Sequence, residues 1–228
     1  MRYFIVTVLF AAIGAFLPGC NFNDPRSVAR IRVFNASPDI GGVDVTLNDE
    51  VEMDNLTFGE GTGYSSVLSG VVMFLVKKAG GGGVLVDEGR AAEARKFFTY
   101  VIFGFSHNLG TELFLDDLEL DKFDKAELRV INLSPTIGPV DVFVSPPGGD
   151  IGTLSPDIAG LGLAEASTNL RVPLSTEQRI RVTPADSKTV LVDSGTVSFN
   201  LGQIRTVVIL DAPGGGAPFS LVFLADKG

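Results

Sequence analysis

The sequence predicts an all-β protein made of two tandem immunoglobulin-like antiparallel β-sandwich domains, preceded by an N-terminal signal peptide. Three observations support this prediction. A motif that starts at Ile31 recurs in register from Leu128, apolar residues occur in short runs broken by Gly, Pro, Asn and Asp, and an apolar N-terminal stretch ends at a single cysteine. Repeats of this kind indicate homologous structural units, and short apolar runs between turn residues indicate strands.

Residues 1–19 have the order of a signal peptide. A positive start is followed by the uncharged, mostly apolar residues 3–16, then by Leu17, Gly19 and Cys20. An apolar stretch of about 7–15 residues before a small-residue site is typical of signal peptides. The end of the segment resembles the lipobox of bacterial lipoproteins, which implies a diacylglyceryl group and an N-acyl chain on Cys20. The alternative is an incidental cysteine in a signal sequence.

Residues 20–28 are polar, contain Pro25 and are expected to form a short tether. We therefore expect an exported protein that is lipid-anchored to the cell envelope, with the membrane as a partner through its N-terminal lipid. By resemblance to lipoprotein sorting in Gram-negative bacteria, Asn21 implies delivery to the outer membrane.

Composition excludes several classes of function. The formal net charge is −9, so a nucleic-acid partner is not expected, because binding nucleic acid depends on Lys and Arg that neutralise phosphates. The same charge disfavours attraction to anionic lipid headgroups. Cys20 is the only cysteine, so no disulfide can form within the chain. We expect no cofactor.

The repeat sets the predicted domain boundaries. Residues 31–45 read IRVFNASPDIGGVDV, and residues 128–142 read LRVINLSPTIGPVDV. We predict a first sandwich domain over residues 29–120 and a second over residues 126–228. Later matches drift in spacing, which indicates small insertions in the second copy, such as the loop at residues 145–150.

Strand patterns predict the elements of the first copy. Seven short strands in a copy of about 90 residues are typical of an immunoglobulin-like sandwich. A helical turn is conceivable at residues 90–96. The predicted strands are Arg30–Asn35, Val43–Leu47, Gly63–Val67, Val71–Lys77, Val84–Asp87, Phe97–Phe105 and Glu112–Leu115.

The order strand, N-x-S-P, short turn and V-D-V resembles the family called domain of unknown function 4397. The segment from Phe58 to Tyr64, F-G-x-x-x-x-Y, and the glycine-rich hairpin also fit. The resemblance covers the mature chain twice, although Leu163 and Asn169 replace the two aromatic residues in the second copy. It implies a secreted or surface-attached β-sandwich and carries no established activity.

Two repeated charge pairs are candidate structural ion pairs, Arg32 with Asp44 and Arg129 with Asp141. If the S-P-x-I-G turn closes a hairpin, each aspartate lies diagonal to its arginine on the neighbouring strand. An exposed cross-strand ion pair is the favoured interpretation, and a ligand site is the alternative.

The acidic junction between the copies is interpreted as a solvated linker. Clustered carboxylates also suit calcium, so a calcium clamp is the alternative. Its acidic residues are Asp116, Asp117, Glu119, Asp121 and Asp124.

No catalytic residue and no metal site are predicted. The glycine runs at residues 79–83 and 213–216 lack the Lys-Ser or Lys-Thr of a phosphate-binding loop and are expected to be hairpin loops. His107 is the only histidine, lies in a loop and has no second histidine or free thiol to join it, so a solvated loop histidine is expected rather than a metal site or a triad.

The sequence therefore predicts a non-enzymatic envelope lipoprotein that serves as a structural or recognition module, with an envelope protein or a polysaccharide as partner. One alternative is a carbohydrate-processing or other hydrolytic enzyme, which would need a cleft with paired carboxylates. Another is a subunit of a larger envelope assembly.

Overall fold

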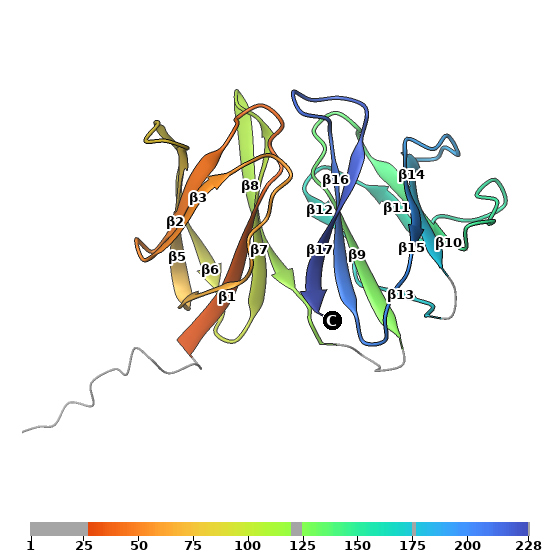
Figure 1. The fold of residues 1–228 in the computed structure, drawn as a ribbon, viewed down its shortest axis with the longest axis horizontal. Coiled ribbons are helices and arrows are strands. Elements are labelled where there is room, and N and C mark those ends of the chain that lie inside the picture. The colour runs from red at the N-terminus through yellow and green to blue at the C-terminus, as the bar shows by residue number, and fades with distance from the viewer. Residues whose placement is uncertain (1–26, 120–124, 175–176, 228) are drawn as a thin grey trace, which may run out of the picture.

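The computed structural model describes residues 27–119, 125–174 and 177–227, and Figure 1 shows their fold. These residues form strands and turns, with none in an α-helix, so the predicted all-β sandwich class is confirmed. Cys20 and most of the tether lie outside the described residues. The first half contains β1 (Val28–Asn35), β2 (Val43–Leu47), β3 (Val51–Leu56), β4 (Ser65–Leu68), β5 (Gly70–Lys78), β6 (Val84–Ala92), β7 (Phe97–Phe105) and β8 (Asn108–Asp116).

The second half repeats this order with more, shorter strands. It contains β9 (Ala126–Asn132), β10 (Val140–Ser145), β11 (Ile158–Leu161), β12 (Glu165–Ala166), β13 (Leu170–Val172), β14 (Gln178–Pro184), β15 (Val192–Val197), β16 (Ile204–Leu210) and β17 (Ser220–Lys227).

Each half is a sandwich of two sheets. In the first half, the outer sheet has the order β3-β2-β5-β6 and the inner sheet β4-β1-β7-β8. In the second half, the inner sheet has the order β12-β9-β16-β17, with β13 also pairing with β9, and the outer sheet β11-β10-β14-β15. Figure 1 shows the first half on the left and the second on the right, with the two inner sheets facing each other in the middle.

Both inner sheets contain one parallel strand pair, which the antiparallel prediction did not include. β1 runs parallel to β7, with Val33 beside Tyr100, and β9 runs parallel to β16, with Val130 beside Val207. The other strand pairs among the described residues are antiparallel. The repeated motif therefore opens each half with a strand in the middle of an inner sheet.

Alternation along the strands builds a core inside each sandwich. In β1, Ala29, Ile31 and Val33 are buried in the first core, and β9 places Leu128 and Val130 in the second core. Side chains that alternate along a strand point to opposite faces of the sheet. The residues between these core positions therefore face the other half of the molecule.

A third apolar core lies between the two inner sheets. Phe34 and Val101 from the first half pack with Ile131 and Val208 from the second, and all four are fully buried. The molecule is thus a stack of four sheets in the order outer, inner, inner, outer. The inner sheets are covered on both faces, which explains the nearly continuous apolar character of β7 and β16.

Several predicted element bounds differ from the structure. β3 was not predicted, since its Val-Glu-Met-Asp-Asn-Leu sequence is largely polar on its exposed face. The helical turn considered at residues 90–96 is wrong, because β6 continues to Ala92 and leads into a tight turn. β8 begins at Asn108, ahead of the predicted start at Glu112.

Candidate functional site

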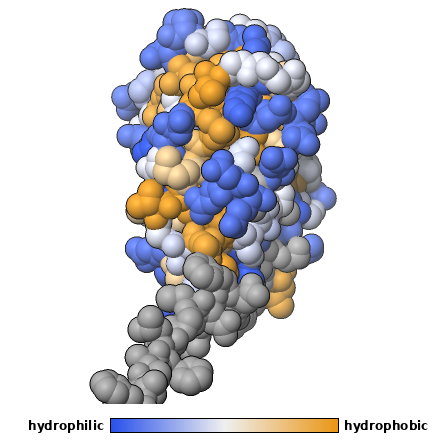
Figure 2. Space-filling model, turned by 90° about the vertical axis from the view of Figure 1, so that its left-hand side faces the viewer, coloured by the Kyte–Doolittle hydropathy of each residue, from blue (hydrophilic) through white to orange (hydrophobic). Residues whose placement is uncertain are grey.

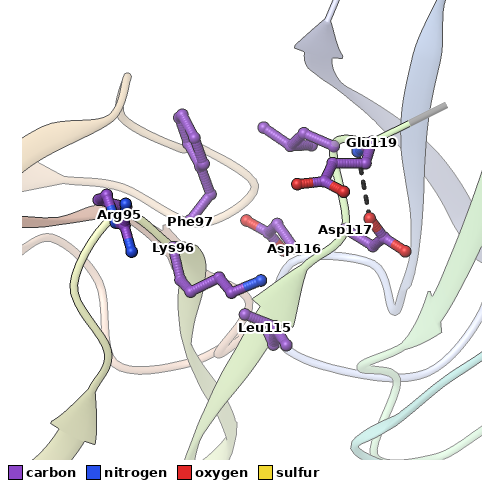
Figure 3. Close-up of a pocket in the computed structure, with 8 residues that line it drawn as sticks. Arg95, Lys96, Phe97, Leu115, Asp116, Asp117 and Glu119 are labelled. Carbon is purple, nitrogen blue, oxygen red and sulfur yellow. Dashed lines mark hydrogen bonds between the residues drawn. The ribbon is translucent and has the colours of Figure 1, made fainter.

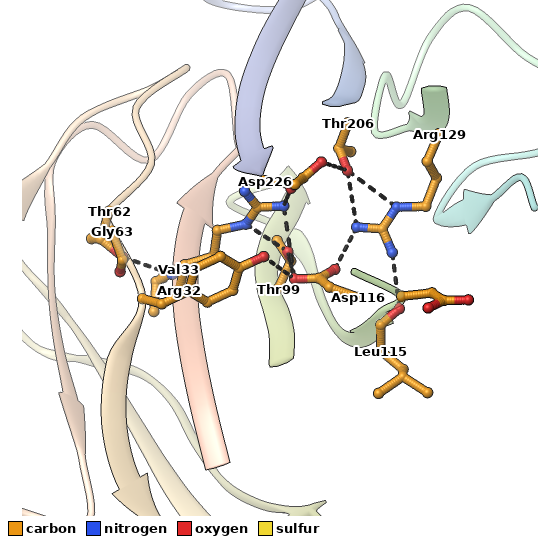
Figure 4. A network of polar contacts seen from close by, with 12 residues as sticks. Arg32, Val33, Thr62, Gly63, Thr99, Leu115, Asp116, Arg129, Thr206 and Asp226 are labelled. Carbon is orange, nitrogen blue, oxygen red and sulfur yellow. Dashed lines mark hydrogen bonds and ion pairs between the residues drawn. The ribbon is translucent and has the colours of Figure 1, made fainter. Parts of the chain in front are cut away.

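A buried polar network lies between the inner sheets, next to the third apolar core (Figure 4). Arg32 on β1 and Arg129 on β9 occupy equivalent places in the repeated motif and are only 3% and 6% exposed. A buried guanidinium requires counter-charges and hydrogen-bond acceptors. The surrounding residues supply both.

Each arginine first contacts a threonine of its own half. The Nε of Arg32 donates a hydrogen bond to Thr99 Oγ1 on the parallel neighbour β7, at 2.8 Å. The Nε of Arg129 donates to Thr206 Oγ1 on β16, at 3.2 Å. The parallel strand pair of each inner sheet thus carries the same arginine and threonine contact.

Each threonine then donates to an aspartate at the end of the next strand of its own half. Thr99 Oγ1 lies 2.7 Å from Asp116 Oδ2, and Thr206 Oγ1 lies 2.8 Å from Asp226 Oδ2. Asp116 ends β8, and Asp226 lies near the end of β17. These two strands occupy matching positions in the inner sheets.

The ion pairs cross from one half to the other. Arg32 of the first half pairs with Asp226 of the second, and Arg129 of the second half pairs with Asp116 of the first. Arg32 also lies 3.7 Å from Asp116. The contacts are reciprocal, as in an interface with two-fold symmetry. The network therefore fixes the two sandwiches relative to each other.

Tyr64 adds a contact from the first half alone. Its hydroxyl donates to Asp116 Oδ2 at 2.6 Å, and its ring lies under the Arg32 guanidinium, 4.9 Å from centroid to Cζ. Burial, and then the negative charge of Asp116, raise the pKa of Tyr64 far above its usual range. The phenol therefore stays protonated and acts as a donor.

Burial also raises the pKa of Asp226. The positive charge of Arg32 and the hydrogen bond from Thr206 act in the opposite direction. Burial is therefore the cost against which the ion pair with Arg32 is formed.

The predicted ion pairs of Arg32 with Asp44 and of Arg129 with Asp141 are wrong. The motif does not close a hairpin, because β1 and β2 belong to opposite sheets of the sandwich, as do β9 and β10. The chain crosses from the inner to the outer sheet within the S-P turn.

Each repeated aspartate instead binds the backbone of an edge strand and of a hairpin turn in its outer sheet. Asp44 accepts hydrogen bonds from the backbone N–H groups of Asn55, at 2.8 Å, and Gly80, at 3.2 Å. Asp141 accepts from the N–H groups of Gly160, at 2.8 Å, and Asp186, at 3.0 Å.

The asparagine of the N-x-S-P motif has an equally structural role, which the sequence analysis did not assign. Asn35 is fully buried, donates through Nδ2 to the carbonyl oxygens of Gly41 and Leu56, and accepts from the N–H of Ser37. Asn132 makes the matching three bonds in the second half. A buried amide that satisfies backbone groups in this way fixes the turn between sheets.

A pocket of about 350 Å³ opens beside the network (Figure 3). Arg95 and Lys96 form one wall, and Asp117 and Glu119 line the opposite side. In Figure 3 the Lys96 side chain extends across the pocket toward the acidic side. The Phe97 ring, which meets the Tyr64 ring edge-on at 5.1 Å, supplies an apolar surface.

The turn that carries this pocket has an unusual backbone. Arg95 adopts a left-handed conformation, φ 65°, whereas the equivalent turn of the second half has Gly202 there, φ 76°. The two turns are equivalent because each donates a backbone hydrogen bond to the start of its own half. The N–H of Arg95 donates to the carbonyl oxygen of Val28, and the N–H of Gly202 donates to that of Lys125. A long side chain is uncommon in this backbone region.

The acidic junction is divided between structural and surface roles. Asp116 belongs to the network, and Asp117 accepts a hydrogen bond from the N–H of Glu119 at 3.1 Å. Asp121 and Asp124 lie outside the described residues. Among the residues that are described, no group of three or more His, Cys, Asp or Glu could hold a metal ion.

The remaining predicted features fall on loops. His107 stacks on Phe105 with centroids 5.6 Å apart, in the turn between β7 and β8. The glycine run at residues 79–83 joins β5 to β6, and the run at residues 213–216 joins β16 to β17. In the described part of the chain, no helix is long and apolar enough to cross a membrane.

Comparisons with known proteins place the chain in a family. One solved structure that matches is the crystal structure of CBMbc, a family CBM26 module from Eubacterium rectale Amy13K, in complex with maltoheptaose. The match has 10% sequence identity and a TM-score of 0.26, and covers 88% of this chain and 98% of that one. No curated protein matches. The family described as "Domain of unknown function (DUF4397)" matches residues 29–143, from β1 into β10, which is half of the chain. The chain therefore belongs to the DUF4397 family.

Proposed function

We propose that this protein is a non-enzymatic lipoprotein of the cell envelope that binds a polysaccharide through the pocket beside the inner-sheet network. The observation that carries the proposal is the composition of this pocket: the cations Arg95 and Lys96 face the carboxylates Asp117 and Glu119 beside the ring of Phe97. Its volume of about 350 Å³ lies within the range of ligand sites in proteins.

Such a lining suits the chemistry of sugars. Ammonium and guanidinium groups donate hydrogen bonds to hydroxyl oxygens, and carboxylates accept hydrogen bonds from hydroxyl groups. The C–H face of a sugar ring packs against an aromatic ring. A neutral, hydroxyl-rich chain can therefore use both charged walls without introducing a net charge into the pocket.

The buried carboxylate that lines the pocket is already engaged in structural contacts. Asp116 already accepts hydrogen bonds from Thr99 and Tyr64 and forms the ion pair with Arg129. Glycoside hydrolysis needs two carboxyl groups free to exchange a proton or attack the sugar. Asp116 serves to hold the two halves together.

The expected address places this pocket near the membrane. The N–H of Arg95 donates to the carbonyl oxygen of Val28 at 2.7 Å, so the pocket turn lies beside the start of β1. With a lipid on Cys20, only the short tether of residues 20–28 separates this end of the molecule from the bilayer. A polysaccharide ligand would then belong to the envelope itself.

Isothermal titration of the full chain with purified envelope polysaccharides tests the binding proposal. We expect Lys96→Gln, which introduces the residue found in the equivalent turn at Gln203, to weaken binding. The matched control Lys78→Gln changes an exposed lysine on β5, away from the pocket, and should bind as the wild type does. Absence of binding by the wild type, or release of new reducing ends from a polysaccharide, would contradict the proposal.

The anchor is tested separately. We expect the wild-type chain in the membrane fraction, with the mass of its N-terminal peptide increased by the lipid, and Cys20→Ala in the soluble fraction. Recovery of both chains in the soluble fraction without added mass would show that Cys20 is not modified.

A further inference from the structure

The outer face of the first outer sheet carries exposed apolar side chains. In β5, Val72, Phe74 and Val76 face the core, so the alternating residues Val71 and Met73 face outward and are 69% and 46% exposed. Val84, at 58%, and Leu85, at 36%, extend this surface along β6; partly exposed Leu75 completes what we call the β5–β6 patch. Figure 2 looks onto this face and shows a broken orange band between blue residues.

A glycine on β6 leaves room for the exposed side chains of β5 to lie over it. A Cβ atom on Gly89 of β6 would lie 2.8 Å from Val71 Cγ1 and 3.1 Å from Met73 Sδ. The side chains of Val71 and Met73 therefore lie across the glycine and form one apolar surface. Solitary apolar residues on a surface need no explanation, but a contiguous apolar area is typical of an interaction site.

The second half has charged residues at the equivalent places. Leu75 lies opposite Thr46 and Asp87, and Arg181 lies opposite Phe143 and Asp193 in the matching register. Leu75 thus corresponds to Arg181, and Met73, two residues earlier, corresponds to Arg179.

These arginines make the second outer face polar. Arg179 forms a two-pronged ion pair with Asp193, at 3.0 and 2.6 Å, and Arg181 donates to Ser145 at 2.5 Å. The apolar patch is therefore a property of the first half and does not follow from the fold.

The second outer sheet is also covered by its own loop. Phe143 on β10 is fully buried although it faces outward, because the Lys188 ammonium lies 4.3 Å from its ring centroid and donates to Leu154 O at 2.5 Å. Leu154 belongs to residues 146–157, which join β10 to β11. In the first half, residues 48–50 make the matching connection and are too few to cover the sheet.

We infer that a second copy of this chain covers the β5–β6 patch, so that two stacks of four sheets join end to end. Stacked repeats need a polar face at each free end, and the β5–β6 patch interrupts this polar face in the first outer sheet but not in the second. The polar, loop-covered second outer sheet of one copy would not bury the β5–β6 patch of another. The patch of one copy can therefore pack only against the patch of the second copy. Such an interface uses the same surface on both copies and closes as a two-fold dimer, without growth into a filament.

The area of the face lies at the lower end of what a specific dimer buries. A four-stranded sheet is about 19 Å wide and a nine-residue strand about 30 Å long, which gives a face on the order of 600 Å² before side-chain relief is counted. A specific interface takes about 800 Å² from each partner. The molecule already contains one interface of this kind, between its own inner sheets.

Cross-linking from a single introduced cysteine tests the inference on the full chain. Packed sheets lie about 10 Å apart, so a bismaleimide of that length should join two chains that carry Met73→Cys and double their mass on a denaturing gel. Arg179→Cys is the matched control, at the equivalent position of the second outer sheet. Chains with this substitution should not be cross-linked and should keep the mass of a monomer. The wild type, whose only cysteine is Cys20, controls for that residue.

The mass of the full chain by light scattering in detergent gives an independent measure. We expect a dimer for the wild type, and a dissociation constant raised more than ten-fold by Met73→Arg combined with Leu75→Arg, the residues of the second half. A monomeric wild type, a Met73→Cys chain that stays single, or one cross-linked only to a different protein would overturn the inference. Equal masses of the wild type and the double variant would also overturn it.

Discussion

Asp116 is the residue at which most contacts of the buried network meet. Its carboxylate accepts hydrogen bonds from Thr99 and Tyr64 and pairs with Arg129 of the other half. Its counterpart Asp226 has Thr206 and Arg32 in the same roles. Two residues that look like ordinary strand-end aspartates therefore determine how the sandwiches meet.

We expect Asp116→Asn to lower the free energy of unfolding by about 3 kcal/mol, because it leaves the buried Arg129 guanidinium without its counter-charge. Urea denaturation followed by circular dichroism measures the change. Asp193→Asn is the control, since its ion pair with Arg179 is 25% and 36% exposed and should contribute at most about 1 kcal/mol. Equal effects of the two substitutions would show that the buried network is not a principal source of stability.

Asp226 should make stability depend on pH. Because burial raises its pKa in the folded chain, the folded state holds this proton more tightly than the unfolded state. Its contribution to stability is therefore complete below about pH 4 and is lost as the pH rises through the raised pKa of the folded state.

Asp226→Asn removes this titration and leaves the other carboxyl groups in place. We expect the free energy of unfolding of the wild type, relative to the variant, to fall between pH 4 and pH 7 in urea titrations at fixed salt. A difference that stays constant over this range would mean that Asp226 has the same pKa in both states.

At the scale of elements, local sequence pattern predicted most of the strands but not their partners. The bounds of Val43–Leu47 and Phe97–Phe105 are confirmed, since alternation or a continuous apolar run marks each of them. The hairpin between β1 and β2 is wrong because the S-P turn carries the chain to the opposite sheet, and local pattern contains no information about which sheet a strand joins.

The network residues could have been found by extending the repeat to the ends of the halves. Thr99 recurs as Thr206, and the Leu-Asp that ends β8 at Asp116 corresponds to the Ala-Asp of β17 at Asp226. The shifted register near Arg205 on β16 and β17 hides this match. Arg32 pairs with the aspartate of the other half because of the way the two halves pack. Local sequence pattern does not predict that packing.

The turn between β6 and β7 offers a test at the same scale. We expect Arg95→Gly to leave the unfolding free energy unchanged or raise it by up to about 1 kcal/mol, because glycine adopts a left-handed backbone without steric cost. The same variant should bind polysaccharide more weakly, since a wall of the pocket is lost. Thermal unfolding measures the change in stability, and titration measures the change in binding. Lower stability with unchanged binding would show that Arg95 serves the fold rather than the pocket.

At the scale of the whole molecule, three apolar cores and one shared polar network make the two halves a single unit. The core between the inner sheets is built from both halves, with Phe34 and Val101 packed against Ile131 and Val208. Neither half could be separated without exposing this surface to water. The repeat therefore predicted that the molecule contains two similar sandwiches. Their association depends on inner-sheet residues that point away from the core of their own half.

This coupling should make the chain unfold in one cooperative step. It has no tryptophan, and of its three tyrosines, Tyr64 and Tyr100 lie in the first half and Tyr3 in the predicted signal peptide. Tyrosine fluorescence therefore reports on the first half. Ile180 is fully buried in the core of the second half, so Ile180→Ala should lower stability by about 2–4 kcal/mol. We expect it to shift the tyrosine transition in urea as far as the circular dichroism transition. A tyrosine transition that stays in place while the dichroism splits into two steps would mean that the sandwiches fold independently despite their shared core.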